Sequence, residues 1–562
     1  MPGISSPGVG SGLDVKTIVE ALVKADITPA KNRLDRQEAK LSTQLSALGQ
    51  VKSALAKLQG SMNKLSTLSQ FQSLTATVSN TSTLTASITG SNTVPGNYQI
   101  EVQQLATQQS LASAPFASTT STLGSGSLTI QFGTYSSGNT SFTPNPNQQA
   151  VTITIDPNQS SLLAIQELIN NSNAGVQASI VQDQSGARLT LISNNTGQAS
   201  AMRISVVDND GNNTDNLGLS SLAYDPTTTV TNLTQTVAAT DSQVLINGLT
   251  LTQSTNALNT AIEGVNINLL TAQPGVPVTL SISNNQQQTT NLVNDFIEQY
   301  NNMLTTINSL TAYNQETKKM NVLQGDAEIR NLQFNLTSIV GKHLDYINGP
   351  IKSLADIGIK ADRKGLLQLD SSVFNKVLNN NYAAIGTIFA KTGTATDPQV
   401  KVSSIGIDIQ AGLYGLELGT YTPGVSLAGT ISGVPAVSSD GLTLTGTKDF
   451  GELSLEILGG STGNRGFIEI KDGFAAQLYN LISNYLGEGG ELSDRTDTLG
   501  EYMKDIDDQR QNLAMRAISL TERYTKQFTA LDTLLMKMQS TSQFLTQQID
   551  NLPISQINNK RK

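Results

Sequence analysis

Residue types that carry catalytic or metal-binding chemistry are scarce in this chain. Its 562 residues include no cysteine and a single histidine, His343. Without cysteine the chain cannot form disulfides, thiolate zinc sites or cysteine nucleophiles. With one histidine it cannot build a multi-histidine metal site, and any histidine-dependent triad would rest on His343. His343 follows Val340 on a face with helical spacing, so we expect it to have a structural or surface role.

One cluster of acidic and amide side chains has the composition of a calcium loop: Asp208, Asp210, Asn212 and Asp215. An EF-hand loop needs glycine at its sixth position and a bidentate glutamate at its twelfth. Here Gly211 falls at the fourth position and Leu219 at the twelfth. We therefore expect an Asp-Gly turn between two strands instead of a calcium site.

Two further groups resemble functional motifs only in part. The glycines between residues 8 and 12 are not preceded by a strand, as a dinucleotide-binding loop requires. Asp505, Asp507 and Asp508 flank Ile506 on a helical stripe, which is typical of a solvated helix face. No nucleophile, base and orienting group occur together. We predict no catalytic, cofactor-binding or metal-binding residue, and a protein that is not an enzyme.

Composition and charge exclude two further classes of protein. Charged residues make up 14% of the chain, against about 25% in a typical soluble protein. The net charge is −9, and no lysine occurs between Lys64 and Lys318. A nucleic-acid binder needs a cationic stripe, so we expect no nucleic-acid partner. No apolar run approaches the ~18 residues of a membrane span, and residues 1–12 do not resemble a cleavable signal, so we expect no membrane insertion.

The elements that carry these residues begin with helices at the N-terminal end. Ser11 followed by Asp14 predicts a helix cap, and we expect Pro29 to end or bend the first helix. A longer apolar stripe then repeats every seven residues, at Leu34, Leu41, Leu48, Leu55 and Met62. This heptad spacing predicts a coiled-coil-like helix that needs a partner.

The C-terminal end has a matching pattern. Its first heptad register comprises Leu499, Ile506, Leu513 and Leu520, and its second includes Tyr524, Leu531, Met538 and Leu545. Arg510 is one of the polar interruptions. No glycine or proline occurs between residues 501 and 552, so one long helix is expected there. The two terminal stripes can pair with one another in one chain, between subunits or with another protein.

The middle of the chain alternates apolar residues with serine and threonine, which predicts β domains with hairpins and one short helix near residues 162–169. The expected fold class is α+β multidomain: a helical coiled-coil-like stalk built from both termini with inserted all-β domains. The expected divisions are N-terminal leg helices (1–72), a discontinuous β domain (73–110 and 231–285), an outer β-rich domain (111–230), a helical stalk domain (286–394 and 467–500), an extra β insertion (395–466) and a C-terminal leg helix (501–562).

Three motifs then resemble one known family, the flagellar filament-cap family FliD, also called flagellar hook-associated protein 2. The first is Ser11-Gly12-Leu13-Asp14. The second contains Asn247 and Gly248. The third, a predicted strand, turn, strand and capped helix, carries Leu354, Asp356, Gly358, Gly365 and Asp370. Together the three motifs span almost the whole chain in the family's order.

The resemblance implies a secreted structural protein at the distal tip of the bacterial flagellum, exported without a cleavable signal peptide. In this family the terminal helices are legs that dock on the filament, and copies form a closed ring, usually taken as a pentamer. The cap guides flagellin into the filament. The implied partners are therefore further copies of the chain, flagellin, the hook-associated junction proteins, the flagellar export apparatus and an export chaperone.

Two alternatives stay open from the sequence. The β domains are also compatible with an adhesin that binds host mucin or other glycans, in addition to the cap role or instead of it. A different axial component, such as a hook–filament junction protein, is the other alternative. The segment 353–370 favours the cap family over this last possibility.

Overall fold

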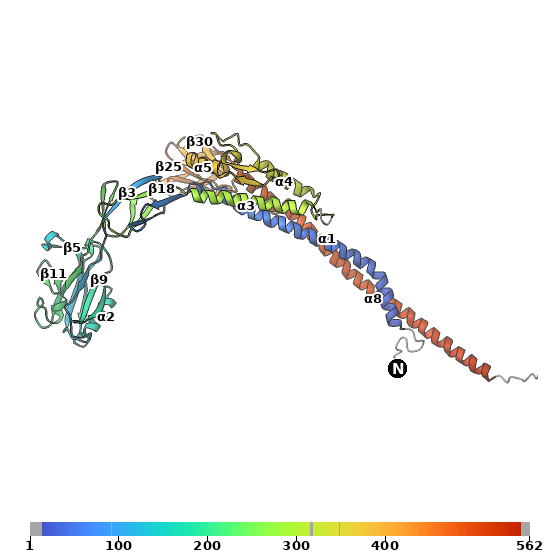
Figure 1. Ribbon diagram of the computed structural model, residues 1–562, viewed down its shortest axis with the longest axis horizontal. Helices are drawn as coiled ribbons and strands as arrows, with labels where there is room; N and C mark the ends of the chain where they lie inside the picture. Colours follow the sequence, from blue (N-terminus) through green and yellow to red (C-terminus); the bar gives the residue numbers. More distant parts are fainter. Residues whose placement is uncertain (1–13, 91–92, 315–317, 348, 552–562) are drawn as a thin grey trace, which may run out of the picture. The chain divides into compact units, whose positions relative to one another are not determined.

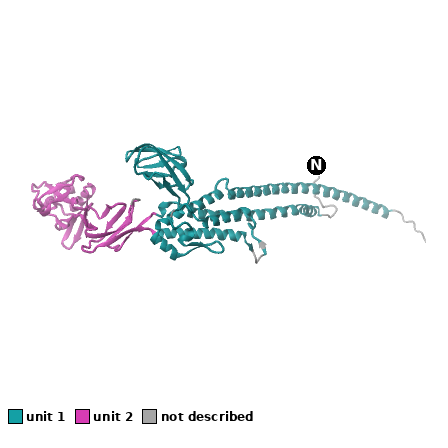
Figure 2. Ribbon diagram, turned by 90° about the horizontal axis from the view of Figure 1, so that it is seen from above, with its two compact units in different colours: residues 1–71, 286–562 teal, residues 72–285 magenta. Residues whose placement is uncertain are grey.

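The computed structural model describes residues 14–90, 93–314, 318–347 and 349–551. The chain divides into two compact units (Figure 2): unit 1 contains residues 1–71 and 286–562, and unit 2 contains residues 72–285. Unit 1 includes the long terminal helices, and unit 2 is built mainly of strands. The expected fold class, helices from both termini with inserted β domains, is confirmed.

The helices of unit 1 surround one apolar core. They are α1 (Val15–Leu65), α3 (Gln286–Thr311), α4 (Ala327–Val340), α5 (Ser371–Asn380), α6 (Tyr382–Phe389), α7 (Phe474–Leu486) and α8 (Glu491–Asp550). Two short hairpins join them, β19 (Tyr313–Asn314) with β20 (Lys319–Met320) and β21 (Ile359–Ala361) with β22 (Leu367–Leu369). Core residues come from both ends of the chain, such as Leu55, Phe296 and Leu499.

Helix α1 does not end at Pro29, which was one of the two outcomes we expected there; it continues through this residue to Leu65. Proline removes one helical hydrogen bond and costs about 3 kcal/mol inside a helix. The Thr28 hydroxyl donates to the Lys24 carbonyl at 2.5 Å, within this turn. On either side of Pro29, Asp26 and Asp35 contact α8. Packing against a second helix therefore holds α1 together where its own sequence would allow a break.

Helix α8 begins earlier than its glycine-free segment suggested. It runs from Glu491 to Asp550 and passes through Gly500, so the expected boundary at residue 500 lies inside one helix. Leu492, Leu499 and Ile506 are buried on the same side of its first turns, which explains why the helix forms across the glycine. Among the described residues, no helix is long and apolar enough to cross a membrane.

A β domain with its own core is inserted into unit 1 between α6 and α7. Its strands are β23 (Thr392–Ala395), β24 (Val400–Ser404), β25 (Gly412–Thr422), β26 (Ser426–Ile431), β27 (Val434–Val437), β28 (Thr443–Gly446), β29 (Ser454–Ile457) and β30 (Gly463–Lys471). They form one sheet in the order β23-β30-β25-β26-β27-β28-β29-β24. Leu416, Leu444 and Ile468 are among the residues that fill its core.

A buried ion pair joins the two points where the chain enters and leaves this β domain. Lys391 Nζ lies 2.8 Å from Asp472 Oδ1, and the two side chains are 1% and 14% exposed. Lys391 Nζ also donates to the Ile409 carbonyl at 2.5 Å, and Asn480 donates to Asp472 Oδ2 at 3.0 Å. The Gly473 amide donates to the Ala390 carbonyl at 3.1 Å. The β domain is thus fixed to the helices by polar contacts at its base.

Unit 2 contains two apolar cores. The first lies within a five-stranded sheet (β1-β18-β3-β14-β15) and a three-stranded sheet (β16-β17-β2). Its strands are β1 (Leu74–Val78), β2 (Leu84–Ile88), β3 (Gly96–Gln104), β14 (Ser242–Ile246), β15 (Leu249–Gln253), β16 (Ala257–Ile262), β17 (Val265–Leu269) and β18 (Val278–Asn284). The alternation of buried and exposed residues along them follows the two-residue period of a strand.

The second core of unit 2 includes Leu128, Ile165 and Leu189. It is formed by β4 (Ser110–Ala112), β5 (Gly126–Tyr135), β6 (Phe142–Pro144), β7 (Val151–Ile155), α2 (Leu162–Asn171), β8 (Val176–Asp183), β9 (Gly186–Ser193), β10 (Ala201–Asp208), β11 (Tyr224–Asp225), β12 (Val230–Thr231) and β13 (Thr234–Val237). The short helix expected near residues 162–169 is confirmed as α2, which the Ser161 hydroxyl caps.

Candidate functional surface on the terminal helices

Helices α1 and α8 lie side by side and run in opposite directions (Figure 1). In α1, Leu34, Leu48, Leu55 and Met62 are buried and Leu41 is half-buried. In α8, Leu499, Ile506 and Leu520 are buried, while Leu513 and Tyr524 are half-buried. The apolar stripes of the two ends therefore pack on each other and on the unit 1 core within a single chain.

Polar contacts fix the register of the two helices. Arg510 Nη2 of α8 lies 2.6 Å from Asp35 Oδ1 of α1 and also contacts the Glu38 carboxylate. The Tyr524 hydroxyl donates to Asp26 Oδ2 at 2.9 Å. Sequence reasoning treated Arg510 as an interruption of the stripe and missed this contact. The sequence feature that could have indicated this contact is the pair of carboxylates spaced three residues apart on α1, Asp35 and Glu38, which lie beside Arg510 in the antiparallel pair.

We expect Arg510→Met to destabilise unit 1 by about 1 kcal/mol or less, because all three charged groups remain partly exposed to water. The loss should shrink as salt is added, since salt screens surface charges. Urea titration at low and high salt measures both effects. Arg516→Met is the matched control, because Arg516 is exposed on the same helix without an ion pair among the described residues. Equal effects of the two variants would contradict the prediction.

The second heptad register of α8 continues with residues that remain exposed in the single chain. Leu531, Met538 and Leu545 are 43%, 61% and 52% exposed. Leu534 and Ile549 are also exposed, and their spacing places them on the same side of the helix. We call these five residues the distal apolar face. A row of exposed apolar residues on one helix face marks a surface for another molecule.

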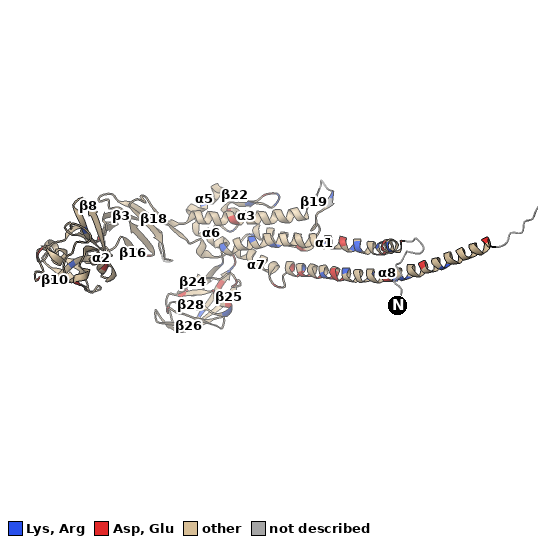
Figure 3. Cartoon of the chain, turned by 90° about the horizontal axis from the view of Figure 1, so that it is seen from below, with Lys and Arg blue, Asp and Glu red and all other residues tan. Residues whose placement is uncertain are grey.

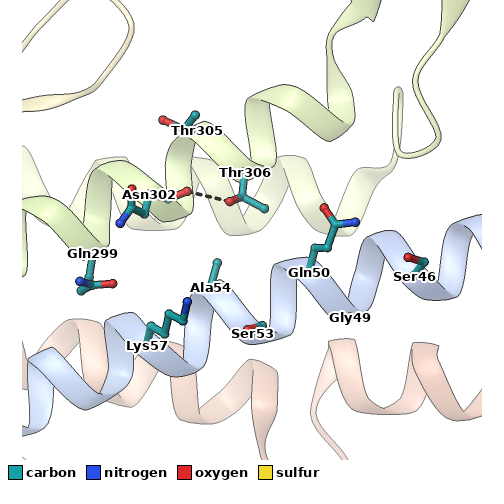
Figure 4. Close-up of a pocket in the computed structure, with 10 residues that line it drawn as sticks. All are labelled: Ser46, Gly49, Gln50, Ser53, Ala54, Lys57, Gln299, Asn302, Thr305 and Thr306. Carbon is teal, nitrogen blue, oxygen red and sulfur yellow. Dashed lines mark hydrogen bonds between the residues drawn. The ribbon is translucent and has the colours of Figure 1, made fainter.

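A hollow in unit 1 lies between α1 and α3 and has a volume of about 590 Å³. Figure 4 shows its lining: Ser46, Gly49, Gln50, Ser53, Ala54 and Lys57 from α1, and Gln299, Asn302, Thr305 and Thr306 from α3. The small side chains of α1 leave this space open against the polar face of α3. The lining contains one charged group, Lys57, and no pair of groups suited to acid–base chemistry.

The family-motif residues of the third segment shape the backbone. Leu354 is buried. Burial raises the pKa of the Asp356 carboxyl, but hydrogen bonds from the Lys352 and Ser353 amides and the Ser353 hydroxyl together lower it by more. The pKa therefore lies below its ordinary value. Gly358 has φ +89°, and a Cβ there would lie 2.8 Å from the Asp370 carbonyl.

The remaining motif residues also form turns and caps. Gly365 closes the β21–β22 turn with φ +82°, and Asp370 caps α5 by accepting from the Ser372 and Val373 amides. Asn247 and Gly248 join β14 to β15, and Asn247 Oδ1 accepts from the Gln99 amide at 2.8 Å. Asp14 caps α1, and hydrogen bonds from Thr17 lower the pKa of its carboxyl. Ser11, Gly12 and Leu13 lie outside the described residues.

The residues first considered for chemistry lie apart from one another. His343 is exposed and its Nδ1 lies 2.9 Å from Asp345 Oδ1. Asp208 ends β10 and begins a turn to Gly211, as predicted, but the next strand starts only at Tyr224. The buried Asp208 carboxylate closes this longer loop by accepting from the Ser220 amide at 3.0 Å. Within the described residues, no three histidine, aspartate or glutamate side chains are placed to hold a metal ion.

Comparison with known proteins matches most of the chain. A family model described as flagellar hook-associated protein 2 C-terminus matches residues 239–540, and the N-terminus model of the same description matches residues 11–109. The flagellar hook-associated protein 2 of Escherichia coli strain K12 is 29% identical, over 98% of this chain and 99% of its own. The A-type protein of Pseudomonas aeruginosa is 25% identical, over 97% of each chain.

Solved structures include a similar chain. The crystal structure of the D1-D2-D3 domains of the flagellar cap protein FliD from Escherichia coli is 25% identical to this chain. It covers 81% of this chain and 99% of its own, with a TM-score of 0.49.

Proposed function

Because this chain belongs to the flagellar hook-associated protein 2 family, we propose that it caps the distal tip of a bacterial flagellar filament outside the cell. Copies form a closed ring, for which the family implies five, and the ring guides flagellin subunits into the growing filament. The work is mechanical and electrostatic, and no bond is made or broken. The chain reaches the tip through the flagellar export apparatus, with an export chaperone, and follows the hook-associated junction proteins.

The observation that carries this proposal is the distal apolar face of α8. It continues the stripe that packs on α1, but its five residues are 43–65% exposed. An apolar row that lacks cover in one chain is suited to reversible packing against helices of a neighbour. We assign this row to contacts at the filament end, either with flagellin or with a junction protein.

The surface of unit 2 is polar and carries few charged side chains, and we propose a separate role for it. Unit 2 holds two of the chain's basic residues, Arg188 and Arg203, and no lysine (Figure 3). Its faces are rich in serine, threonine and asparagine, so they offer weak polar contacts and few charged ones. We propose that these faces guide an arriving flagellin without retaining it.

Deletion of the gene in its flagellated host tests the proposal. We expect cells that lack the protein to release flagellin monomers into the medium and to carry hooks without filaments. Expression of the full chain should restore filaments, with the protein at their tips in electron micrographs. Normal filaments in its absence, or localisation at the hook boundary, would contradict the cap assignment.

A further inference from the structure

Unit 1 contains a hollow that none of the roles above uses. It has a volume of about 440 Å³ and lies at the C-terminal end of α4. Its floor is apolar, since Val340, Ile359 and Leu367 line it and are buried. Lys342 and Lys360 also line it and are exposed, and His343 lies beside them. We call this hollow the basic pocket.

Neither lysine of the basic pocket is in an ion pair within the described part of the chain. Lys342 Nζ contacts the neutral Gln477 Oε1 at 3.3 Å, and Lys360 is in no ion pair among the described residues. The neighbouring Asp356 carboxylate accepts the Lys352 and Ser353 amides. Asp345 contacts His343. An apolar floor under two unpaired ammonium groups suits an apolar side chain that is flanked by carboxylates.

The first half of α8 carries such a combination. Five acidic residues at spacings of three and four form one row, which we call the acidic stripe: Asp494, Asp497, Glu501, Asp505 and Asp508. All five are exposed, and their spacing places the row opposite the buried Leu499 and Ile506. The exposed Lys504 lies beside the row, which therefore keeps a net negative charge. Tyr502, 53% exposed, lies beside the row and next to Glu501.

We propose that the basic pocket of one copy binds Tyr502 and the acidic stripe of a second copy. A second copy is required because, in the single chain, the stripe and Tyr502 are exposed to solvent and do not line the pocket. The contact joins two different surfaces, so it is head-to-tail, and such contacts close into a ring when the rotation between copies permits. This inference rests on the proposed ring and identifies one interface that builds it.

Charge reversal on either surface tests the contact. We expect either double variant, Lys342→Glu/Lys360→Glu or Glu501→Lys/Asp505→Lys, to raise the dissociation constant of self-association about tenfold or more. The reason is that like charges would then face each other. Sedimentation of the full chain over a concentration series measures this. Asp507→Lys is the matched control, since Asp507 is exposed on α8 outside the stripe. Its effect should be small.

An equimolar mixture of the two reversed variants gives the sharper test. Each variant alone places like charges in the contact, whereas the mixture pairs a reversed pocket with a reversed stripe and an original pocket with an original stripe. Association should therefore return in the mixture. Thermal unfolding of each variant should match the original chain, because every substituted residue is exposed.

The proposal is overturned if the full chain stays monomeric, if both reversals leave self-association unchanged, or if the mixture does not recover it. A reversal that weakens binding of flagellin but not self-association also overturns it, because the occupant would then be flagellin. Electron microscopy of filament tips judges the cap role separately. Normal capping by non-associating variants would refute the interface and leave the cap assignment standing.

Discussion

Removal of residues 531–562 is expected to abolish filament growth and leave both units folded. The deleted part of α8 holds the whole distal apolar face, whose residues are exposed and contribute little to the stability of the single chain. Filament counts by microscopy and flagellin in the culture medium measure the first effect. Circular dichroism and calorimetry of the purified chain measure the second.

A point variant distinguishes the apolar face from the length of the helix. Each leucine or methionine contributes about 1.5–3 kcal/mol when fully covered, so Met538→Ser/Leu545→Ser should weaken docking about 100-fold or more. Gln543→Ser/Gln547→Ser is the control, because these exposed residues lie on the other side of the same helix. Filaments of normal length with the apolar variant would show that this face is not the docking surface.

Replacement of Lys391 by methionine is expected to destabilise unit 1 by about 3–5 kcal/mol, because it leaves the Asp472 carboxylate without its cation in a largely buried site. Calorimetry should show the loss as a lower unfolding temperature. The same measurement on Lys401→Met provides a comparison within the same β domain, since the Lys401–Glu456 pair is 67% and 40% exposed. That variant should cost about 1 kcal/mol or less.

The double variant Lys391→Met/Asp472→Asn separates charge from packing. With both charges removed, the Asn480 contact can persist on the amide oxygen, and we expect more than half of the lost stability to return. If the double variant were as unstable as Lys391→Met, the loss would come from disturbed packing at the base of the β domain. A cost of Lys391→Met no larger than that of Lys401→Met would contradict the prediction outright.

Local patterns in the sequence predicted the local structure well. The helix near residues 162–169, the hairpin that turns at Gly365 and the cap at Asp370 all follow from short motifs whose hydrogen bonds stay within a few residues. The heptad stripes likewise predicted the two long helices, since their spacing reflects the face that each helix buries.

Contacts between distant parts of the chain were not predictable in the same way. Pro29 lies inside a helix that packs beside α8, and no local pattern in the sequence predicts that packing. The Lys391–Asp472 pair joins residues that neither periodicity nor motif connects. The distal apolar face illustrates a different limit: heptad spacing gave the correct side of α8, but only the structure separates its covered part from its exposed part.

The antiparallel pairing of α1 and α8 has a consequence for the order in which the chain can fold. Gln59 and Ser483 share a hydrogen bond at 2.8 Å although 424 positions separate them, and Leu55 and Leu499 belong to one core. Unit 2 is a continuous segment and can complete its cores from its own residues. Unit 1 closes only when both ends of the chain are present, so a chain delivered end-first to its destination acquires its helical half last.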